Sequence, residues 1–515
     1  MMNLIWLVLG ILTVVSIALL MKLSKSYRLN WIAWGGMGLG IALILFCIAW
    51  SVGSVLEGVP RAAAMGVVFF GFPGIVLSTA TMKYIDAKLG KPAAPAGDPT
   101  GPEGKIEEDI WPHFEIPQKD LPRLEMPFAP QLSKLAKTLE GSLRYLAYGS
   151  LMAAFIIGLA ASKKDYETMV KIKFPDEKLT KVNDNPVVFQ LGEKQDGKGN
   201  YIVISEGQGY GGPFVIGVRI MDDAKVHEVL LLDDRETPAY IQKIEKANFP
   251  AQFVGKSVAD DFLPDVDINI ISGATISTMA GTEAIRKAAH IAATQYFKME
   301  SKWQNESWNF GLAEVLILII FVLAFIPQIY AKKPWSYIYM AATVAVVGFY
   351  LNASMSIGNL SGLVMGFIPG LKAHLIWWIL VFGTLAAIII TGKNVYCFRI
   401  CPFYGVEFLL TKIGGTRLKP SKNILRRSKF VMNFLLWLSL ITAFLSRHPA
   451  LGSYEPFAMM FSLDGVGIQW FILPVALIGS FFMSAFWCRF FCPCGHALTK
   501  LAQFRKKIVK MFNRG

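Results

Sequence analysis

A short run of small and hydroxylated residues, Ile271-Ser-Gly-Ala-Thr275-Ile-Ser-Thr278, is the first feature suited to chemistry. It lies between the apolar end of a strand-like run and a stretch with helical spacing. Gly273 permits backbone angles that other residues avoid, and the free N–H groups of a helix start attract an anion. The turn therefore suits a phosphate, which the Thr275 hydroxyl can carry as an ester. The alternative is that Ser277 or Thr278 merely caps the helix.

Two cysteine pairs near the C-terminus form the second candidate. Cys397 and Cys401 are followed by proline, and so are Cys488 and Cys492. The i, i+4 spacing places both sulfurs of a pair on one helical face, and the proline tends to end that helix. Two such helices offer four thiolates to an iron–sulfur or other metal centre, although the spacing is not that of a ferredoxin. The alternative is that these cysteines stay reduced and only pack.

The composition indicates a membrane protein. Hydrophobic residues make up 54% of the 515, charged residues make up 17%, and the mean hydropathy is +0.44. The net charge of +14 does not indicate a nucleic-acid partner, because Lys and Arg cluster beside apolar runs and no DNA-reading motif appears. We therefore expect membrane lipid, and no nucleic acid, around the chain. The apolar run at 3–21 precedes its basic residues, the reverse of a signal peptide, so we expect a retained helix.

Nine apolar stretches are long enough to be candidate transmembrane helices, the economical way to cross lipid. They cover residues 3–22, 30–52, 62–82, 142–161, 309–331, 336–354, 372–392, 428–446 and 467–487.

One orientation satisfies every basic loop. The positive-inside rule assigns the basic segments at 22–28, 83–91, 332–333, 412–429 and the C-terminal tail to the cytoplasm. Alternation then assigns 53–61, 162–308, 355–371 and 447–466 to the exocytoplasmic side. This topology predicts that both cysteine pairs lie at the cytoplasmic edge of the membrane.

The chain divides into five predicted regions. Residues 1–83 form a three-helix membrane region, 84–141 a Pro-rich cytoplasmic linker, 142–161 a transmembrane helix, 162–308 an exocytoplasmic domain and 309–515 a five-helix membrane domain. In the domain at 162–308, three alternating runs read as strands and 278–297 reads as a helix. The predicted fold is a polytopic α-helical membrane protein of about nine transmembrane helices with one exocytoplasmic α+β domain.

Further strings in this domain carry a family resemblance. Gly209-Tyr-Gly-Gly-Pro213, Asp233-Asp-Arg-Glu236-Thr237-Pro238 and Phe253-Val-Gly-Lys256 precede the Thr275 turn. Their order resembles the FMN-binding domain of the NqrC, RnfG and NosR/NirI families. The resemblance implies that a flavin transferase attaches FMN through its phosphate to Thr275. It also implies that the cofactor site includes Tyr210, Glu236, Thr237, Ser272, Gly273 and Ala274. Asn269 departs from the acidic residue that family members often have before the motif.

The membrane part carries a second resemblance. An outward FMN domain, a helical bundle and two Cys-x3-Cys-Pro motifs, over residues 142–515, resemble the NosR/NirI group and its short RdhC (PceC-type) branch from reductive dehalogenase operons. The first 90 residues, with Met65-Gly-Val-Val-Phe-Phe-Gly71, resemble RdhB, the membrane anchor of the dehalogenase catalytic subunit. Glu57-Gly-Val59 keeps only the first glutamate of the anchors' Glu-x-Glu.

Together these resemblances imply a function in organohalide respiration. Menaquinol or another quinol would supply electrons, and FMN, with the cysteine-bound centre, would pass them to an exocytoplasmic reductive dehalogenase held on the N-terminal helices. We expect an electron-transfer component rather than a stand-alone enzyme. The flavin and the cysteines would be separated by roughly the bilayer core, about 30 Å. The alternative is a redox-sensing regulatory or maturation factor of the NosR/NirI type.

Overall fold

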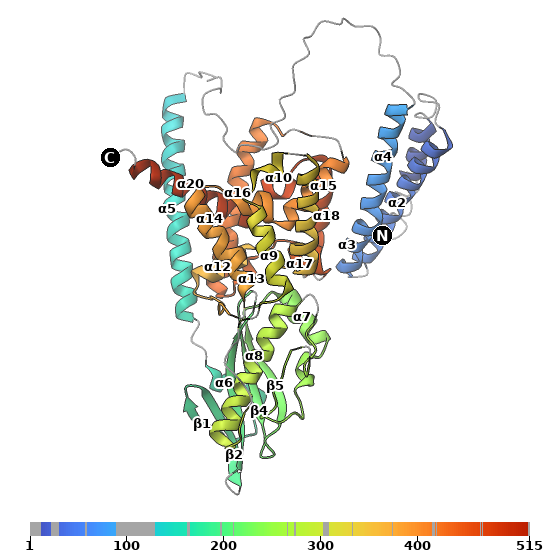
Figure 1. The fold of residues 1–515 in the computed structure, drawn as a ribbon. Coiled ribbons are helices and arrows are strands. Elements are labelled where there is room, and N and C mark those ends of the chain that lie inside the picture. Colours follow the sequence, from blue (N-terminus) through green and yellow to red (C-terminus); the bar gives the residue numbers. More distant parts are fainter. Residues whose placement is uncertain are drawn as a thin grey trace, which may run out of the picture.

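The structure is a computed structural model in which two bodies, a helical bundle and an α+β domain, lie end to end (Figure 1). It describes residues 12–21, 30–56, 59–88, 129–161, 165–195, 198–209, 211–264, 266–271, 274–301, 308, 310–331, 333–372, 374–414, 418, 420–463, 465 and 467–512. The predicted cofactor residues Tyr210, Ser272 and Gly273 lie outside the described residues, as do the first nine residues of the predicted span at 3–22, its last residue, and most of the predicted linker.

The α+β domain is built on one antiparallel sheet whose strands follow in chain order. The strands are β1 (Leu179–Asp184), β2 (Val187–Gln195), β3 (Lys198–Gln208), β4 (Pro213–Ile220) and β5 (Val226–Asp234). Both faces are covered, so residues of both parities are buried along β4. The predicted strands correspond to β3, β4 and β5, whereas β1 and β2 were not predicted.

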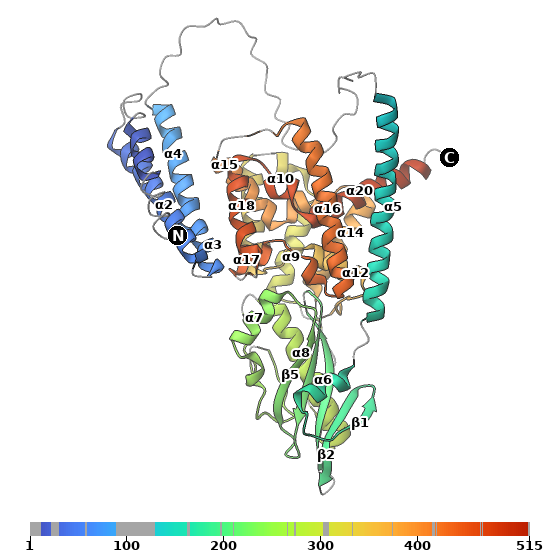
Figure 2. The ribbon, with the colours of Figure 1, turned by 180° about the vertical axis from the view of Figure 1, so that it is seen from behind.

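Helix α8 (Thr275–Ile291), continued by η3 (Ala292–Tyr296), packs on one sheet face. Its approach is close because Gly207 has no side chain: a Cβ there would lie 2.2 Å from the Ala280 carbonyl oxygen. The helices α6 (Tyr166–Lys173), α7 (Pro238–Lys246) and η2 (Phe249–Gln252) complete the domain. Because α8 is anchored in this way, its first residue is held at the end of the domain that meets the bundle (Figures 1 and 2).

The bundle consists of helices that are broken more often than the sequence predicts. They are α5 (Ala129–Ala161), α9 (Leu312–Leu323), α10 (Pro327–Ala331), α11 (Lys333–Thr343), η4 (Val344–Tyr350), α12 (Ile357–Val364), α13 (Leu375–Trp377), η5 (Trp378–Phe382), α14 (Gly383–Thr391), η6 (Tyr396–Ile400), α15 (Pro402–Gly414), α16 (Lys422–Ser446), η7 (Pro449–Gly452), α17 (Phe457–Ser462), α18 (Gln469–Phe482), α19 (Phe486–Phe490) and α20 (Pro493–Phe512). Helix α5 begins at Ala129, within the range predicted as linker.

Four described helical stretches have the length and apolar composition to cross a membrane: Trp31–Val55, Arg61–Ile85, Gly141–Ala161 and Asn423–Ser446. Shorter apolar helices at Leu12–Met21, Leu312–Leu323, Leu375–Thr391 and Gln469–Phe482 coincide with other predicted spans. The apolar helical character is confirmed for these regions, and the number of spans stays a prediction.

The N-terminal helices α2 (Trp31–Leu56), α3 (Pro60–Gly66), η1 (Val67–Gly71) and α4 (Phe72–Lys88) flank the bundle on the side away from α5 (Figures 1 and 2). The Lys83 ammonium donates a hydrogen bond to the Ile413 carbonyl at 2.9 Å, and Phe72 meets Phe481 edge to face. This segment is therefore docked on α15 and α18.

Candidate functional site

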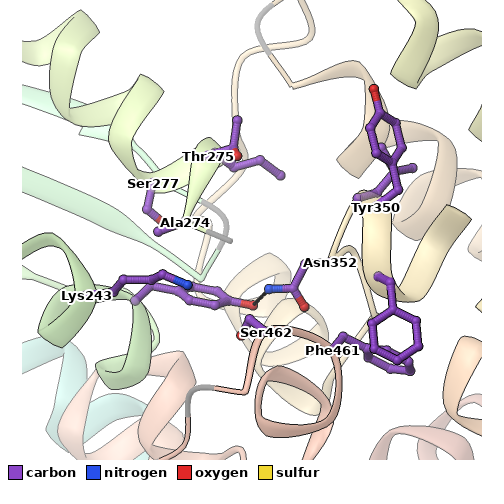
Figure 3. A pocket seen from close by; sticks show the side chains of 12 residues that line it. Lys243, Ala274, Thr275, Ser277, Tyr350, Asn352, Phe461 and Ser462 are labelled. Carbon is purple, nitrogen blue, oxygen red and sulfur yellow. Dashed lines mark hydrogen bonds between the residues drawn. The ribbon is translucent and has the colours of Figure 1, made fainter. Parts of the chain in front are cut away.

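A cavity of about 250 Å³ lies where the α+β domain meets the bundle. One wall comes from the start of α8 and from Tyr240 and Lys243 of α7. The other comes from residues 349–352 at the end of η4 and from Phe461 and Ser462 of α17. Figure 3 shows the two sets of side chains facing each other across this space. The candidate site is thus shared by segments far apart in the sequence.

Thr275 is the first residue of α8, and it is exposed to this cavity. Its N-cap residue, Ala274, gives no side-chain cap. The Ser277 hydroxyl donates to Glu236 at 2.9 Å, and the Thr278 hydroxyl donates to the Ala274 carbonyl at 3.0 Å. Neither hydroxyl therefore caps the helix, which removes the alternative interpretation of this motif. The first-turn N–H groups face a position that suits an anion.

Glu236 is fully buried behind Thr275 and braces the turn. Its Oε1 accepts hydrogen bonds from the backbone N–H groups of Gly211 at 2.7 Å and Thr237 at 2.8 Å, and its Oε2 accepts from Ser277. One carboxylate thus ties together the glycine loop, the start of α7 and the first turn of α8. A Cβ on Gly211 would lie 2.5 Å from Oε1, so the loop needs glycine there. Sequence reasoning placed Glu236 and Thr237 beside the cofactor, and neither lines this cavity.

The wall from the bundle is aromatic and begins at a π-helical turn, a feature often found at functional sites. Phe349 packs edge to face on Phe461 with ring centroids 5.3 Å apart. Beyond η4, Asn352 adopts a left-handed φ of 46° and donates from Nδ2 to the Tyr240 hydroxyl at 3.1 Å. Phe349 and Asn352 were missed from the sequence because they lie in an apolar run that otherwise indicates only a membrane span, and Phe461 was missed because it lies in a predicted exocytoplasmic loop.

Lys243 is the only charged side chain among the described residues that line the cavity. It extends from α7 along Tyr240 toward Asn352 (Figure 3). Its half-buried ammonium places positive charge on the floor of an otherwise aromatic and neutral space.

Additional contacts fix the α+β domain on the bundle. The Arg235 guanidinium donates to the Ser446 carbonyl at 3.1 Å, and His448 lies 3.7 Å from Asp234. Ala458 of α17 belongs to the apolar cluster that forms the core of the α+β domain. The cavity walls are therefore held in a fixed relation.

The cysteine pairs take a different local geometry from the predicted one. Cys401 and Cys492 are the N-caps of α15 and α20: their carbonyl oxygens accept from Gly405 at 3.1 Å and His496 at 3.2 Å. The Cys492 sulfur also accepts from the Gly495 N–H at 3.3 Å. Each following proline is the first residue of a new helix, where its missing N–H costs nothing. The helix that holds Cys397 ends before the proline, as predicted, but Cys401 lies just beyond its last residue in extended backbone, so the two cysteines of this pair do not share a continuous helix.

The two cysteine motifs meet inside the bundle. A Cβ on Gly495 would lie 3.4 Å from the Cys492 sulfur and 3.5 Å from the Cys397 sulfur. Buried Glu407 of α15 accepts from the backbone N–H groups of Trp487 at 2.6 Å and Cys488 at 3.3 Å, which fixes the second motif against the first. Among the described residues, no group of three or more His, Cys, Asp or Glu side chains has an arrangement that could hold a metal ion. The four-thiolate centre therefore stays a prediction.

The first motif lies partway along the helices of the bundle, and its predicted position at the cytoplasmic membrane edge stays a prediction. Gly405, one turn after Cys401, packs on Val344 and Met340 midway along α11 and η4. From there α15 runs back to Ile413, beside Lys83. Cys401 is therefore on the side of Gly405 that is nearer to the α+β domain.

Aromatic side chains connect this region with the cavity. Phe403, two residues after Cys401, lies 5.3 Å from Phe457 and 6.2 Å from Trp487, measured between ring centroids. Phe457 is one turn of α17 before Phe461, the ring that lines the cavity. Each step along this series spans less than about 7 Å. These aromatic contacts form a series of short steps between the cavity and the first cysteine motif, and the expected separation of about 30 Å between flavin and cysteines stays a prediction.

Comparison with protein families gives two matches. Residues 4–89 match VcrB, described as chloroethene reductive dehalogenase membrane anchor protein, and residues 209–290 match the FMN-binding domain family. The second match contains the Glu236 brace and the Thr275 helix start.

Three curated proteins are similar over about 39% of the chain. Regulatory protein NosR of Pseudomonas aeruginosa is 25% identical over 224 residues, and the match covers 31% of its length. Regulatory protein NosR of Stutzerimonas stutzeri is 23% identical over 223 residues, covering 30% of its length, and protein NirI of Paracoccus denitrificans is 22% identical over 225 residues, covering 32%. The matches thus span about a third of the length of these relatives.

No solved structure matches the chain significantly. The apolar helices, the α+β domain and both sets of matches agree with one another. They identify the chain as a membrane FMN-binding protein similar to NosR and NirI, of the RdhC-like kind, with an N-terminal segment similar to the dehalogenase membrane anchor.

Proposed function

We propose that this protein is a membrane-bound electron carrier that passes electrons from menaquinol or another quinol, through FMN esterified to Thr275, to a reductive dehalogenase on the exocytoplasmic side. The observation that carries the proposal is the position of Thr275. Its hydroxyl opens into a cavity whose opposite wall belongs to the membrane bundle. A cofactor held there would touch both the water-exposed domain and the helices that can reach a membrane donor.

The residues present suit FMN. The uncapped start of α8 offers N–H groups to the phosphate, and Thr275 offers the oxygen for the ester that a flavin transferase would form. The cavity, about 250 Å³, is slightly smaller than the roughly 300–1,000 Å³ of whole-ligand pockets, which suits the flat ring while the remaining chain follows the helix start. FMN bound there supplies a group that accepts two electrons and releases them one at a time.

The protein side chains have distinct tasks in this proposal. Glu236 holds the phosphate turn in place through its three hydrogen bonds. Phe349 and Phe461 provide aromatic surface and exclude water from the ring, while Lys243 places a cation where negative charge develops on reduction. The aromatic series from Phe461 to Phe403 gives a short route between this cavity and the cysteine motifs, where an iron–sulfur or other metal centre held by Cys397, Cys401, Cys488 and Cys492 is part of the proposal.

The N-terminal segment supports the choice of acceptor. It matches a family described as a chloroethene reductive dehalogenase membrane anchor, and it is docked on α15 and α18 beside the α+β domain. An enzyme held by this segment would stand next to the flavin cavity. The anchor and the electron donor would then be one polypeptide.

A second candidate is a redox-sensing regulatory or maturation factor. It is favoured by the similarity to NosR, which is described as a regulatory protein. In that case the flavin would change redox state without sustaining turnover of a terminal reductase.

The deciding experiment has two stages. Full-length protein is produced in membranes with a flavin transferase, and the mass of the peptide that contains Thr275 is measured in wild type and Thr275→Ala. An FMN adduct in the wild type alone supports the covalent site, and its absence from both overturns it. The loaded protein is then mixed with reduced quinol and a reductive dehalogenase. Sustained halide release that Thr275→Ala lacks supports electron transfer, whereas flavin reduction without turnover favours the regulatory role.

A further inference from the structure

A second cavity of about 250 Å³ lies where the anchor-like segment, the FMN-binding domain and the bundle meet. Arg61 of α3 forms one side, Lys243 and Lys246 of α7 form another, and Trp470 of α18 forms a third. Lys243 lines both cavities, so the two spaces are adjacent.

The described lining of this cavity has three cationic side chains and no carboxylate. Lys243 and Lys246 are one turn apart on the same helix and point into the same hollow. Arg61 approaches from the opposite helix, donates to the Leu463 carbonyl at 3.4 Å and stacks over the Trp470 ring at 5.6 Å. An anion placed between Arg61 and Lys246 would be attracted by both of these charges.

The position of the cavity at the ends of two apolar helices indicates which kind of anion it binds. Arg61 is the first residue of the apolar stretch Arg61–Ile85, and Trp470 is the second residue of the apolar helix α18. Both mark the level at which apolar helices end, where arginine and tryptophan commonly meet lipid headgroups. Beyond this level the surfaces of the two helices are apolar, and they make contact at Phe72 and Phe481.

We propose that this cavity binds the phosphodiester headgroup of an anionic phospholipid. Arg61 and Lys246 hold the phosphate, Trp470 supports the glycerol region, and the acyl chains follow the apolar surface between the anchor-like segment and α18. The bound lipid contacts the anchor-like segment, the FMN-binding domain and the bundle, and so connects them. Its phosphate also lies next to Lys243, the cation of the flavin cavity, so occupancy alters the field at the flavin site. The lipid site itself does not depend on the proposed electron-transfer function.

The test uses the full chain in nanodiscs that contain phosphatidylcholine alone or phosphatidylcholine with about one third phosphatidylglycerol, and it measures co-purified lipid by native mass spectrometry. We expect wild type to retain phosphatidylglycerol selectively. Arg61→Gln combined with Lys246→Gln should lower that retention about tenfold or more, since each cation near an anionic surface contributes about 1 kcal/mol. The matched control, Lys171→Gln combined with Lys181→Gln, removes two exposed lysines of the FMN-binding domain away from this cavity and should leave retention unchanged.

A third arm separates a lipid headgroup from free phosphate. Inorganic phosphate is added to protein in phosphatidylcholine nanodiscs, and protection of α7 from hydrogen exchange is compared with protection by phosphatidylglycerol. Protection by inorganic phosphate equal to that by the lipid would assign the site to a soluble anion and overturn the proposal. Equal phosphatidylglycerol retention by wild type and by the Arg61/Lys246 double variant would overturn the proposal as well. Binding of an acidic protein partner, instead of lipid, to these cations would also overturn it.

Discussion

The Asn352 amide donates a hydrogen bond to the Tyr240 hydroxyl at 3.1 Å, and this contact joins the bundle, just beyond η4, to the FMN-binding domain beside the cavity that Thr275 lines. It is a direct polar link between the two walls. A displacement of either wall relative to the other would therefore strain this hydrogen bond.

Tyr240→Phe removes this link and keeps the ring. We expect the docking of the two parts to weaken by about 1 kcal/mol, the usual net value of one hydrogen bond. Hydrogen exchange should rise in α7 and in residues 344–352 while the sheet stays protected. Tyr296→Phe, at the end of η3 and away from the cavity, is the control. Unchanged exchange in residues 344–352 would show that the other contacts alone hold the interface.

Lys243→Met should lower the midpoint potential of the flavin, because the cation stabilises the negative charge of the reduced ring. We expect a fall of roughly 30–60 mV, which corresponds to about 1.4–3 kcal/mol for two electrons. Redox titration of the flavin absorbance measures it. Lys171→Met is the control, since Lys171 is an exposed lysine of the same domain that lines neither cavity. Equal shifts in both variants would assign the effect to general surface charge.

Glu236→Gln should destabilise the FMN-binding domain and impair flavin attachment. Glutamine has a single acceptor oxygen in place of two, and its amide group would face the donors of the brace. The expected loss is about 2–3 kcal/mol of unfolding free energy, since buried donors lose their partners. Thermal unfolding and flavin fluorescence in gels report the two effects.

Two companion variants keep this test informative. Ser277→Ala removes only one of the three hydrogen bonds, so a loss of about 1 kcal/mol and continued flavin attachment are expected. Glu228→Gln changes a half-exposed carboxylate on β5 and should behave as wild type. Normal flavin loading and stability in Glu236→Gln would contradict the bracing role.

The cysteine centre is tested by metal content. Protein purified without oxygen, from cells that overproduce iron–sulfur assembly factors, should contain iron that is lost in Cys401→Ser and Cys492→Ser. Cys47→Ser is the control, because Cys47 lies in α2, away from both motifs. Iron analysis and electron paramagnetic resonance give the readout, and metal-free wild-type protein would leave the motifs as helix caps.

Local patterns were enough to predict β3, β4, β5 and α8, because their alternating or helical apolar residues face one core. They missed β1, whose burial alternates weakly, and α7, a short helix that begins at Pro238. The position of Thr275 at a helix start was predicted for the same reason, since small residues followed by an apolar helical period mark such a turn.

The cavity wall that the bundle contributes could not be predicted from local sequence patterns. Asn352 and Phe461 reach the cavity only because of how the bundle folds. Asn352 lies in a predicted membrane span and Phe461 in a predicted exocytoplasmic loop, and neither neighbourhood indicates a cofactor site. The cysteine geometry was misjudged because the i, i+4 rule assumes a continuous helix. The chain becomes extended at Cys401, so this residue is the N-cap of the next helix and does not continue the helix of Cys397.

The contribution of Ala458 to the core of the FMN-binding domain bears on how the protein can be divided. A fragment cut at the sequence boundaries 162–308 would lack this residue and the whole aromatic wall beyond it. Its apolar core would be open on one side, and its flavin would face water. Potentials or reactivities measured on such a fragment would describe a solvent-exposed flavin rather than the one the complete chain encloses.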